Sequence, residues 1–172
     1  PFAYLYHQNF KSIVIFNLLF SIFHFSMQPL SPLDGRYSAQ VAELRPFFTE
    51  DALMRARIFV ELSYLAALAQ EKGIAELKPF TIAQKKAMQK IVDDFDDAEA
   101  VKIHEIEKKT NHDVKAIEYY LREALPKVLG KDFKTEFIHF ALTSEDVNNL
   151  AYGILIQDAL KTVLLPELKA MT

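Results

Sequence analysis

Apolar residues recur at helical spacing along most of the chain. The first such run places Leu53, Ala56 and Val60 three and four residues apart, on one face of a helix. Thr49 precedes the run with an oxygen that can cap a helix, and Gly73 follows it as a residue type that often ends one. We therefore predict a helix that begins after Thr49 and ends at Gly73.

The same periodicity predicts five more helices. They are placed at 82–92, 98–108, 113–125, 135–141 and from 144 onward. Thr81 and Gln84 have the spacing of a capping box, and Pro126, which lacks a backbone N–H, is expected to end the helix at 113–125. No alternation of apolar and polar residues bounded by turn signals competes as a strand. The predicted fold class is therefore all-α.

The last predicted helix is still apolar and periodic where the sequence stops at Thr172. Such a helix needs partners to cover its apolar face, which indicates the front of a longer protein. We accordingly expect an N-terminal helical domain over 27–132. Residues 133–172 are then the truncated start of a central helical-bundle domain, with its first long helix.

The first 26 residues differ in character from the rest. They contain one basic residue and no acidic one, and the stretch KSIVIFNLLFSIFHFS at 11–26 is almost continuously apolar. This segment is either a leader, meaning a signal peptide or anchor, or non-native upstream sequence read in frame ahead of a natural start at Met27. We favour the second interpretation, because the run is short for a membrane-spanning helix and no small-x-small cleavage site follows it.

The composition of the chain excludes several classes of function. The formal net charge is −3 and no polybasic stretch occurs, so neither nucleic acid nor a membrane surface is an expected partner. The absence of cysteine excludes disulfides and thiolate metal sites, and it fits a reducing, cytoplasmic compartment. With 4 glycines and no glycine-rich loop, the chain has no Walker or dinucleotide-binding loop. We expect no metal, because His104 with Glu107 lacks further ligands.

Three short polar segments interrupt this apolar scaffold, and the first is SPLDGRY at 31–37. Its proline, aspartate and glycine predict a turn that presents Arg36 and Tyr37. An arginine fork suits phosphate or carboxylate, and the tyrosine adds a ring face and a hydroxyl. The alternative is an ordinary surface turn with an ion pair.

The second segment is Asn111-His112-Asp113, at the start of the helix predicted at 113–125. Asn111 or Asp113 can cap that helix, whose free N–H groups attract anions. Histidine side chains titrate near neutrality, so His112 can donate to an anion or relay a proton, with Asp113 orienting the imidazole. The alternative is a helix cap beside an exposed histidine.

The third segment is FIHFALTSEDVNNLAY at 137–152. Thr143 and Ser144 lie where the long helix begins, and Thr143 has capping-box spacing from Asp146. Hydroxyls beside helix N-terminal amides can hold a carboxylate, although this segment can equally be a cap alone. We interpret His139 as a core histidine. Asn148 and its neighbour are unusual inside a helix and can hydrogen-bond to another helix or to a ligand.

Together, SPLDGRY, EKKTNHDVKAIEYYL and EFIHFALTSEDVNNLAY resemble the amino-terminal part of the adenylosuccinate lyases, in their bacterial form, within the fumarase/aspartase superfamily. The resemblance covers 27–172 and leaves 1–26 without a counterpart. It implies a homotetramer built on a long helical bundle and no cofactor. The implied reaction is elimination of fumarate from the nucleotide adenylosuccinate, giving AMP, and from the succinyl-aminoimidazole-carboxamide ribotide of purine biosynthesis.

The resemblance also implies a set of substrate-binding residues, which are Arg36, Tyr37, Asn111, His112, Asp113, Thr143 and Ser144. The first segment would contact the nucleotide, the second would place His112 near the phosphate or the reacting centre, and the third would hold the succinyl carboxylates. The family's main acid and base lie in T-H-G-Q-P and S-S-x-M-P segments, which this sequence lacks. His112 is then auxiliary at most, and the chain alone is expected to be inactive.

Two other interpretations remain open. Another lyase of the same superfamily, argininosuccinate lyase or fumarase, is disfavoured by the T-N-H-D-V-K-A segment. The alternative from a different class is a non-catalytic helical interaction module.

Overall fold

The computed structural model describes residues 29–171, and every regular element in this range is helical, which confirms the all-α prediction. The prediction that 1–26 are foreign to the protein falls outside the described residues. The chain divides between Ala42 and Glu43 into two compact units. The expected domain boundary near 132 stays a prediction.

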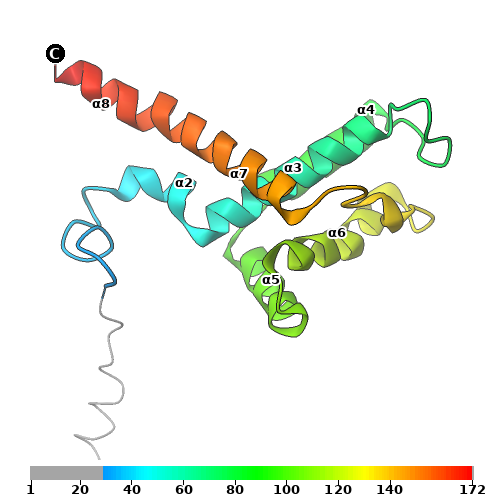
Figure 1. The fold of residues 1–172 in the computed structure, drawn as a ribbon, viewed down its shortest axis with the longest axis horizontal. Coiled ribbons are helices and arrows are strands. Elements are labelled where there is room, and N and C mark those ends of the chain that lie inside the picture. The colour runs from blue at the N-terminus through cyan, green and yellow to red at the C-terminus, as the bar shows by residue number, and fades with distance from the viewer. Residues whose placement is uncertain (1–28, 172) are drawn as a thin grey trace, which may run out of the picture. The chain divides into compact units, whose positions relative to one another are not determined.

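The elements follow one another along the chain as Figure 1 labels them. They are η1 (Ala42–Leu44), α2 (Arg45–Phe48), α3 (Glu50–Leu68), α4 (Ile82–Asp93), α5 (Asp97–Thr110), α6 (Asp113–Leu129), η2 (Thr135–Phe137), α7 (Ser144–Ala159), η3 (Leu160–Leu164) and α8 (Leu165–Ala170). Of the η elements, η1 and η2 are 3₁₀ turns and η3 is π-helical. The segment from Ser144 to Ala170 is therefore continuously helical, as the sequence predicts.

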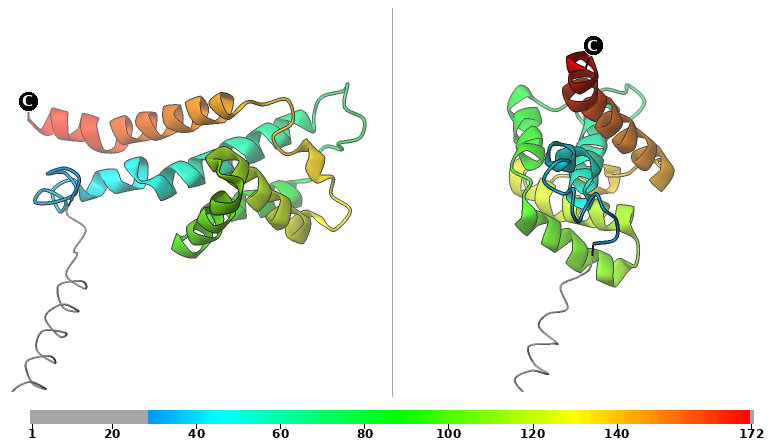
Figure 2. Two further views of the ribbon diagram at one scale, coloured as in Figure 1. Left: turned by 60° about the horizontal axis from the view of Figure 1, so that its bottom comes forward. Right: turned by 90° about the vertical axis from the view of Figure 1, so that its left-hand side faces the viewer.

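Helix α3 is shared by two hydrophobic cores. On one side Ile58 packs with Ile103 of α5 and Leu121 of α6, and on the other Val60 packs with Val147 of α7. Residues 58 and 60 lie about 200° apart around a helix, so α3 can face both neighbours at once. Ile58 and Leu121 are fully buried, and each such side chain contributes ~1.5–3 kcal/mol. Helix α7 runs back alongside α3 in the opposite direction (Figure 2).

The predicted caps are confirmed at both early helices. Thr49 accepts a hydrogen bond from the Ala52 amide at the start of α3. Thr81 and Gln84 form the predicted capping box at the start of α4. A side-chain cap of this kind contributes ~1 kcal/mol by satisfying an amide that the helix leaves free.

Three predicted boundaries are wrong, each for a physical reason. Helix α3 ends at Leu68, not at Gly73, because the exposed run 70–72 has no apolar face to pack. Helix α6 passes Pro126 and ends at Leu129; a proline in the last turn removes only one intrahelical hydrogen bond. The helix expected at 135–141 is a 3₁₀ turn followed by turns, since His139 and Ala141 have φ values of +59°.

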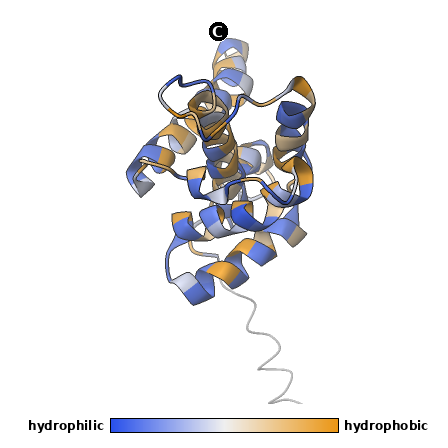
Figure 3. Ribbon diagram, turned by 90° about the vertical axis from the view of Figure 1, so that its right-hand side faces the viewer, coloured by the Kyte–Doolittle hydropathy of each residue, from blue (hydrophilic) through white to orange (hydrophobic). Residues whose placement is uncertain are grey.

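Each helix of the described chain carries both polar and apolar residues along its length (Figure 3). On α7, η3 and α8 several large apolar side chains remain exposed, among them Leu160, Leu164 and Leu168, the last at 58%. This confirms that the long helix carries an apolar face that the described residues leave uncovered. No helix within 29–171 is long and apolar enough to cross a membrane.

Candidate functional site

The segment SPLDGRY forms a tight turn within the first unit. The Asp34 carboxylate accepts hydrogen bonds from the Leu30 and Ser31 amides at 3.0 and 2.7 Å, and the Ser31 bonds hold the pKa of Asp34 below its usual value. A Cβ at Gly35 would come within 2.9 Å of Pro29, so the turn requires glycine there. Arg36 and Tyr37 follow, both exposed, with the guanidinium 4.8 Å from the ring centroid.

The junction of α5 and α6 presents the Asn-His-Asp segment. Asn111 ends α5 in the left-handed conformation, with φ +50°, and its amide donates to the Glu107 carbonyl at 2.7 Å. His112 is the N-cap of α6, where its Nδ1 accepts from the Lys115 amide at 3.2 Å. The prediction that Asn111 or Asp113 caps this helix is therefore wrong. Because Nδ1 accepts, the proton of the neutral imidazole lies on Nε2.

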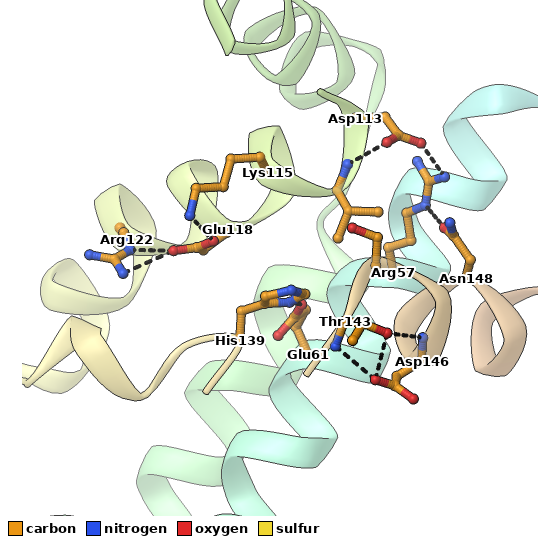
Figure 4. Close-up of polar contacts among 12 residues, drawn as sticks. Arg57, Glu61, Asp113, Lys115, Glu118, Arg122, His139, Thr143, Asp146 and Asn148 are labelled. Carbon is orange, nitrogen blue, oxygen red and sulfur yellow. Dashed lines mark hydrogen bonds and ion pairs between the residues drawn. The ribbon is translucent and has the colours of Figure 1, made fainter. Parts of the chain in front are cut away.

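Asp113 is held from two sides within the second unit. Its Oδ1 accepts from the Val114 amide at 2.8 Å and its Oδ2 from Nη2 of Arg57 at 2.6 Å. Nε of Arg57 donates in turn to Oδ1 of Asn148 on α7 at 2.9 Å (Figure 4). Partial burial raises the pKa of Asp113, but the Val114 amide and the Arg57 guanidinium outweigh it and leave the pKa below its usual value.

The start of α7 is the predicted capping box. Thr143 accepts from the Asp146 amide, and the Asp146 carboxylate accepts from the Thr143 amide and hydroxyl at 2.7 and 2.8 Å. These two bonds hold the pKa of Asp146 below its usual value. Ser144 follows, and its Oγ lies 3.4 Å from Nε2 of His112. The structure thus brings together one residue from each of two predicted segments, 32 positions apart.

The Asn-His-Asp segment lines an open cavity of about 480 Å³. Arg57 and Tyr152 contribute to the same lining, together with apolar side chains of α3. Arg57 is nearly buried and the two side chains of His112 and Asp113 are about half exposed. Glu50 and Glu107 also line the cavity, so its one arginine, already paired with Asp113, lies among three carboxylates, and His112 is the group that faces solvent there.

A second buried polar pair lies beside this site. The Glu61 side chain on α3 is fully buried, and its Oε1 lies 2.5 Å from Nδ1 of His139. Its Oε2 has no hydrogen-bond partner among the described residues. Burial raises the pKa of Glu61, and the hydrogen bond and charge of His139 oppose that rise. His139 was predicted to lie in an apolar helix, but it lies in a turn and pairs with a carboxylate.

One candidate metal-ligand group occurs among the described residues. Nε2 of His104 lies 3.9 Å from a Glu50 carboxylate oxygen, and Nδ1 lies 3.4 Å from Glu107. The expectation that His104 and Glu107 lack a third ligand is therefore wrong, because the fold brings up Glu50 from the start of α3. The group is partly exposed.

Two of the residues that organise the site escaped sequence reasoning. Arg57 and Glu61 lie four positions apart on α3, and both side chains are buried. Charged residues inside an apolar periodic run are the signal that would have marked them. The prediction that Asn148 hydrogen-bonds to a neighbouring helix is confirmed by its contact with Arg57.

Comparison with known proteins identifies relatives for most of the chain. A family model described as lyase matches residues 35–172. The chain is 44% identical over 142 residues to the adenylosuccinate lyase of Haemophilus influenzae, covering 83% of this chain and 31% of that relative. It is 40% identical over 144 residues to that of Vibrio cholerae, covering 84% and 32%, and 40% over 141 residues to that of Escherichia coli, covering 82% and 31%.

The chain spans about a third of the length of these curated relatives. The family match covers far more than half of the chain and includes all three polar segments except the first residues of SPLDGRY. The predicted resemblance to adenylosuccinate lyases is confirmed, and the chain belongs to the lyase family.

Proposed function

We propose that this chain is the amino-terminal part of a longer lyase that eliminates fumarate from adenylosuccinate, giving AMP. The same enzyme would eliminate fumarate from the succinyl-aminoimidazole-carboxamide ribotide in purine biosynthesis. Three relatives carry the name adenylosuccinate lyase. The observation that carries the proposal is the 3.4 Å approach of His112 Nε2 to Ser144 Oγ, because it joins two of the three segments on which the resemblance rests.

The substrate's chemistry sets what the site must supply. It carries a phosphate and two succinyl carboxylates, so it needs cationic groups and donors. In the elimination, a base removes a proton from the carbon beside a carboxylate, the carbon–nitrogen bond breaks, and the leaving nitrogen takes a proton. Donors that hold the carboxylate also stabilise the charge that develops beside it in the transition state.

We assign substrate-binding roles to all seven predicted residues. Arg36 and Tyr37 would contact the nucleotide, and the Thr143 and Ser144 hydroxyls would hold the carboxylates. Asn111, His112 and Asp113 would form the wall near the phosphate or the reacting centre. With Nδ1 engaged by the helix, His112 would act through Nε2. The proposed reaction needs no cofactor and no metal.

The proposed assembly is a homotetramer in the cytoplasm, with neither nucleic acid nor a membrane as partner. The apolar side chains exposed on α7, η3 and α8 support it. An exposed apolar stripe of this kind is a typical helix–helix packing surface. Other helices of the proposed bundle, from the same or another subunit, would cover it.

Kinetics of the full-length protein test the proposal. Fumarate release from adenylosuccinate, followed by ultraviolet absorbance, should be present in the wild type. His112→Ala and Ser144→Ala should each lower kcat/KM by ~10²-fold or more, with far-UV circular dichroism unchanged. His104→Ala on α5 and Ser63→Ala on α3 are matched controls that should keep wild-type rates. Wild-type rates in both site variants would refute the assigned roles.

The 172-residue chain alone should show no turnover in the same assay. The resemblance places the main acid and base in segments that its sequence does not contain. Fumarate release by the purified chain would contradict that assignment.

A further inference from the structure

Arg57 lies at the meeting point of three helices. It projects from α3, and its guanidinium reaches Asp113 at the start of α6 and Asn148 in the second turn of α7 (Figure 4). The two acceptors are bound through different nitrogens, at 2.6 and 2.9 Å. A planar fork of donors can fix two partners in one geometry, which a lysine ammonium cannot do as rigidly.

The two helices that Arg57 joins are the ones that carry the proposed site. His112 directly precedes Asp113, and Ser144 lies one turn before Asn148. The 3.4 Å approach between His112 and Ser144 therefore depends on how the first turns of α6 and α7 are placed relative to each other. Arg57 is the described side chain that bonds both to the start of α6 and to the second turn of α7.

The arginine is built into the protein rather than offered to solvent. Its side chain is 7% exposed, and a buried guanidinium requires partners because desolvation disfavours its charge. Asp113 supplies a negative charge and the Asn148 amide supplies a neutral acceptor. The amide is itself oriented, since its Nδ2 donates to Glu145 at 3.4 Å.

Asp113 anchors this arrangement on α6. One oxygen accepts from Arg57 and the other from the Val114 amide. Its contacts tie the start of α6 to α3 and leave Nε2 of the adjacent histidine facing Ser144.

We propose that Arg57 is a positioning residue, which clamps the N-terminal ends of α6 and α7 through Asp113 and Asn148 so that His112 and Ser144 face one substrate. The kinetic consequences rest on the proposed function; the clamp itself does not. A misplacement of about 1 Å at a site can cost on the order of 10²-fold in rate.

The clamp can be tested in the full-length protein without any activity. Hydrogen–deuterium exchange should speed up in Arg57→Met at the second turns of both α6 and α7, where the backbone amides are hydrogen-bonded within each helix. Arg55→Met is the matched control, since Arg55 lies on the same helix and donates instead to the Val92 carbonyl at 3.2 Å. It should leave both turns as protected as in the wild type. Unchanged exchange in Arg57→Met, or faster exchange at only one of the two turns, would overturn the clamp.

Kinetics then separate positioning from direct substrate binding. Arg57→Met should lower kcat by ~10–10²-fold with KM within about threefold of the wild type. Asn148→Asp, which keeps an acceptor for Arg57, should retain most of kcat, whereas Asn148→Leu should lose it. A tenfold rise in KM with kcat preserved in Arg57→Met would overturn the proposal by making Arg57 a substrate ligand. If the wild type released no fumarate, the proposed function would be refuted. The hydrogen–deuterium exchange experiment would then be the test of whether Arg57 clamps the two helices.

Discussion

His139→Ala removes the imidazole that partners the buried carboxylate of Glu61. The two side chains lie 2.5 Å apart, and Oε2 of Glu61 already has no partner among the described residues. The alanine keeps the β-carbon, so the strain of the positive φ at this position does not change. The variant therefore isolates the side-chain pair.

The expected cost follows from the burial of the carboxylate. Removing one partner of a buried ion pair costs ~3–5 kcal/mol, because the other charge is left unpaired. We therefore expect a loss of about 3 kcal/mol at neutral pH. A second variant, Glu61→Leu/His139→Ala, removes the charge as well and should recover most of that loss.

The pH dependence provides a further check on the cause. Burial raises the pKa of Glu61, and the His139 hydrogen bond opposes the rise. Because the pKa of Glu61 is higher in the folded than in the unfolded protein, the free energy of unfolding falls as pH rises from the unfolded-state pKa, about 4.3, through the folded-state pKa. Without His139 this fall should be larger, so the cost of His139→Ala should shrink as the solution is made acidic enough to protonate Glu61.

Urea unfolding of the 172-residue chain, followed by far-UV circular dichroism at several pH values, measures these differences. A double variant no more stable than His139→Ala would show that the orphaned charge is not the cause. A cost that stays constant from neutral to acidic pH would refute the same reasoning independently.

Three further predictions concern other parts of the second unit. Asp113→Asn should lower the free energy of unfolding by ~0.5–1 kcal/mol, since the carboxylate is half exposed and solvent screens it. Because folding lowers the pKa of Asp113, the wild type should be the more stable protein above the unfolded-state pKa. Unfolding at stepped pH should show that this advantage disappears as pH falls through the folded-state pKa. Ala141→Gly should raise stability by ~0.5–1 kcal/mol in thermal unfolding, because φ of +59° strains alanine but not glycine, and a lower Tm would contradict the strain. In the full-length protein, Leu168→Asp should shift sedimentation towards smaller species, whereas unchanged sedimentation would show that the exposed apolar stripe is not part of the proposed subunit interface.

The sequence predicts the fold well where a local signal decides it. Helix starts at Thr49, Thr81 and Thr143 are marked by side chains that bond within three residues, so their caps can be predicted from spacing. Helix ends are decided by what the next turn would pack against. Single stop signals mispredict two of them: α3 ends before the exposed run 70–72 rather than at Gly73, and α6 passes Pro126 because a proline in the last turn removes only one intrahelical hydrogen bond.

The same distinction separates the parts of the candidate site. The three polar segments could be found from the sequence because the residues of each lie next to one another along the chain. Arg57 could not be assigned a role in this way, because both of its partners lie more than fifty positions away, at 113 and 148. The cap at α6 was missed for another reason: a histidine caps a helix less often than asparagine or aspartate, and both stood beside it.

Helix α3 holds the stretch that leads into α7 at two points. Glu61 pairs with His139, four residues before Thr143, and Arg57 bonds to Asn148, five residues after it. Between these ties the chain passes through two residues of positive φ, which cost energy and persist only when neighbouring contacts fix them. The two buried charges, one turn apart on α3, therefore explain how a strained loop can deliver Ser144 to a fixed position beside His112.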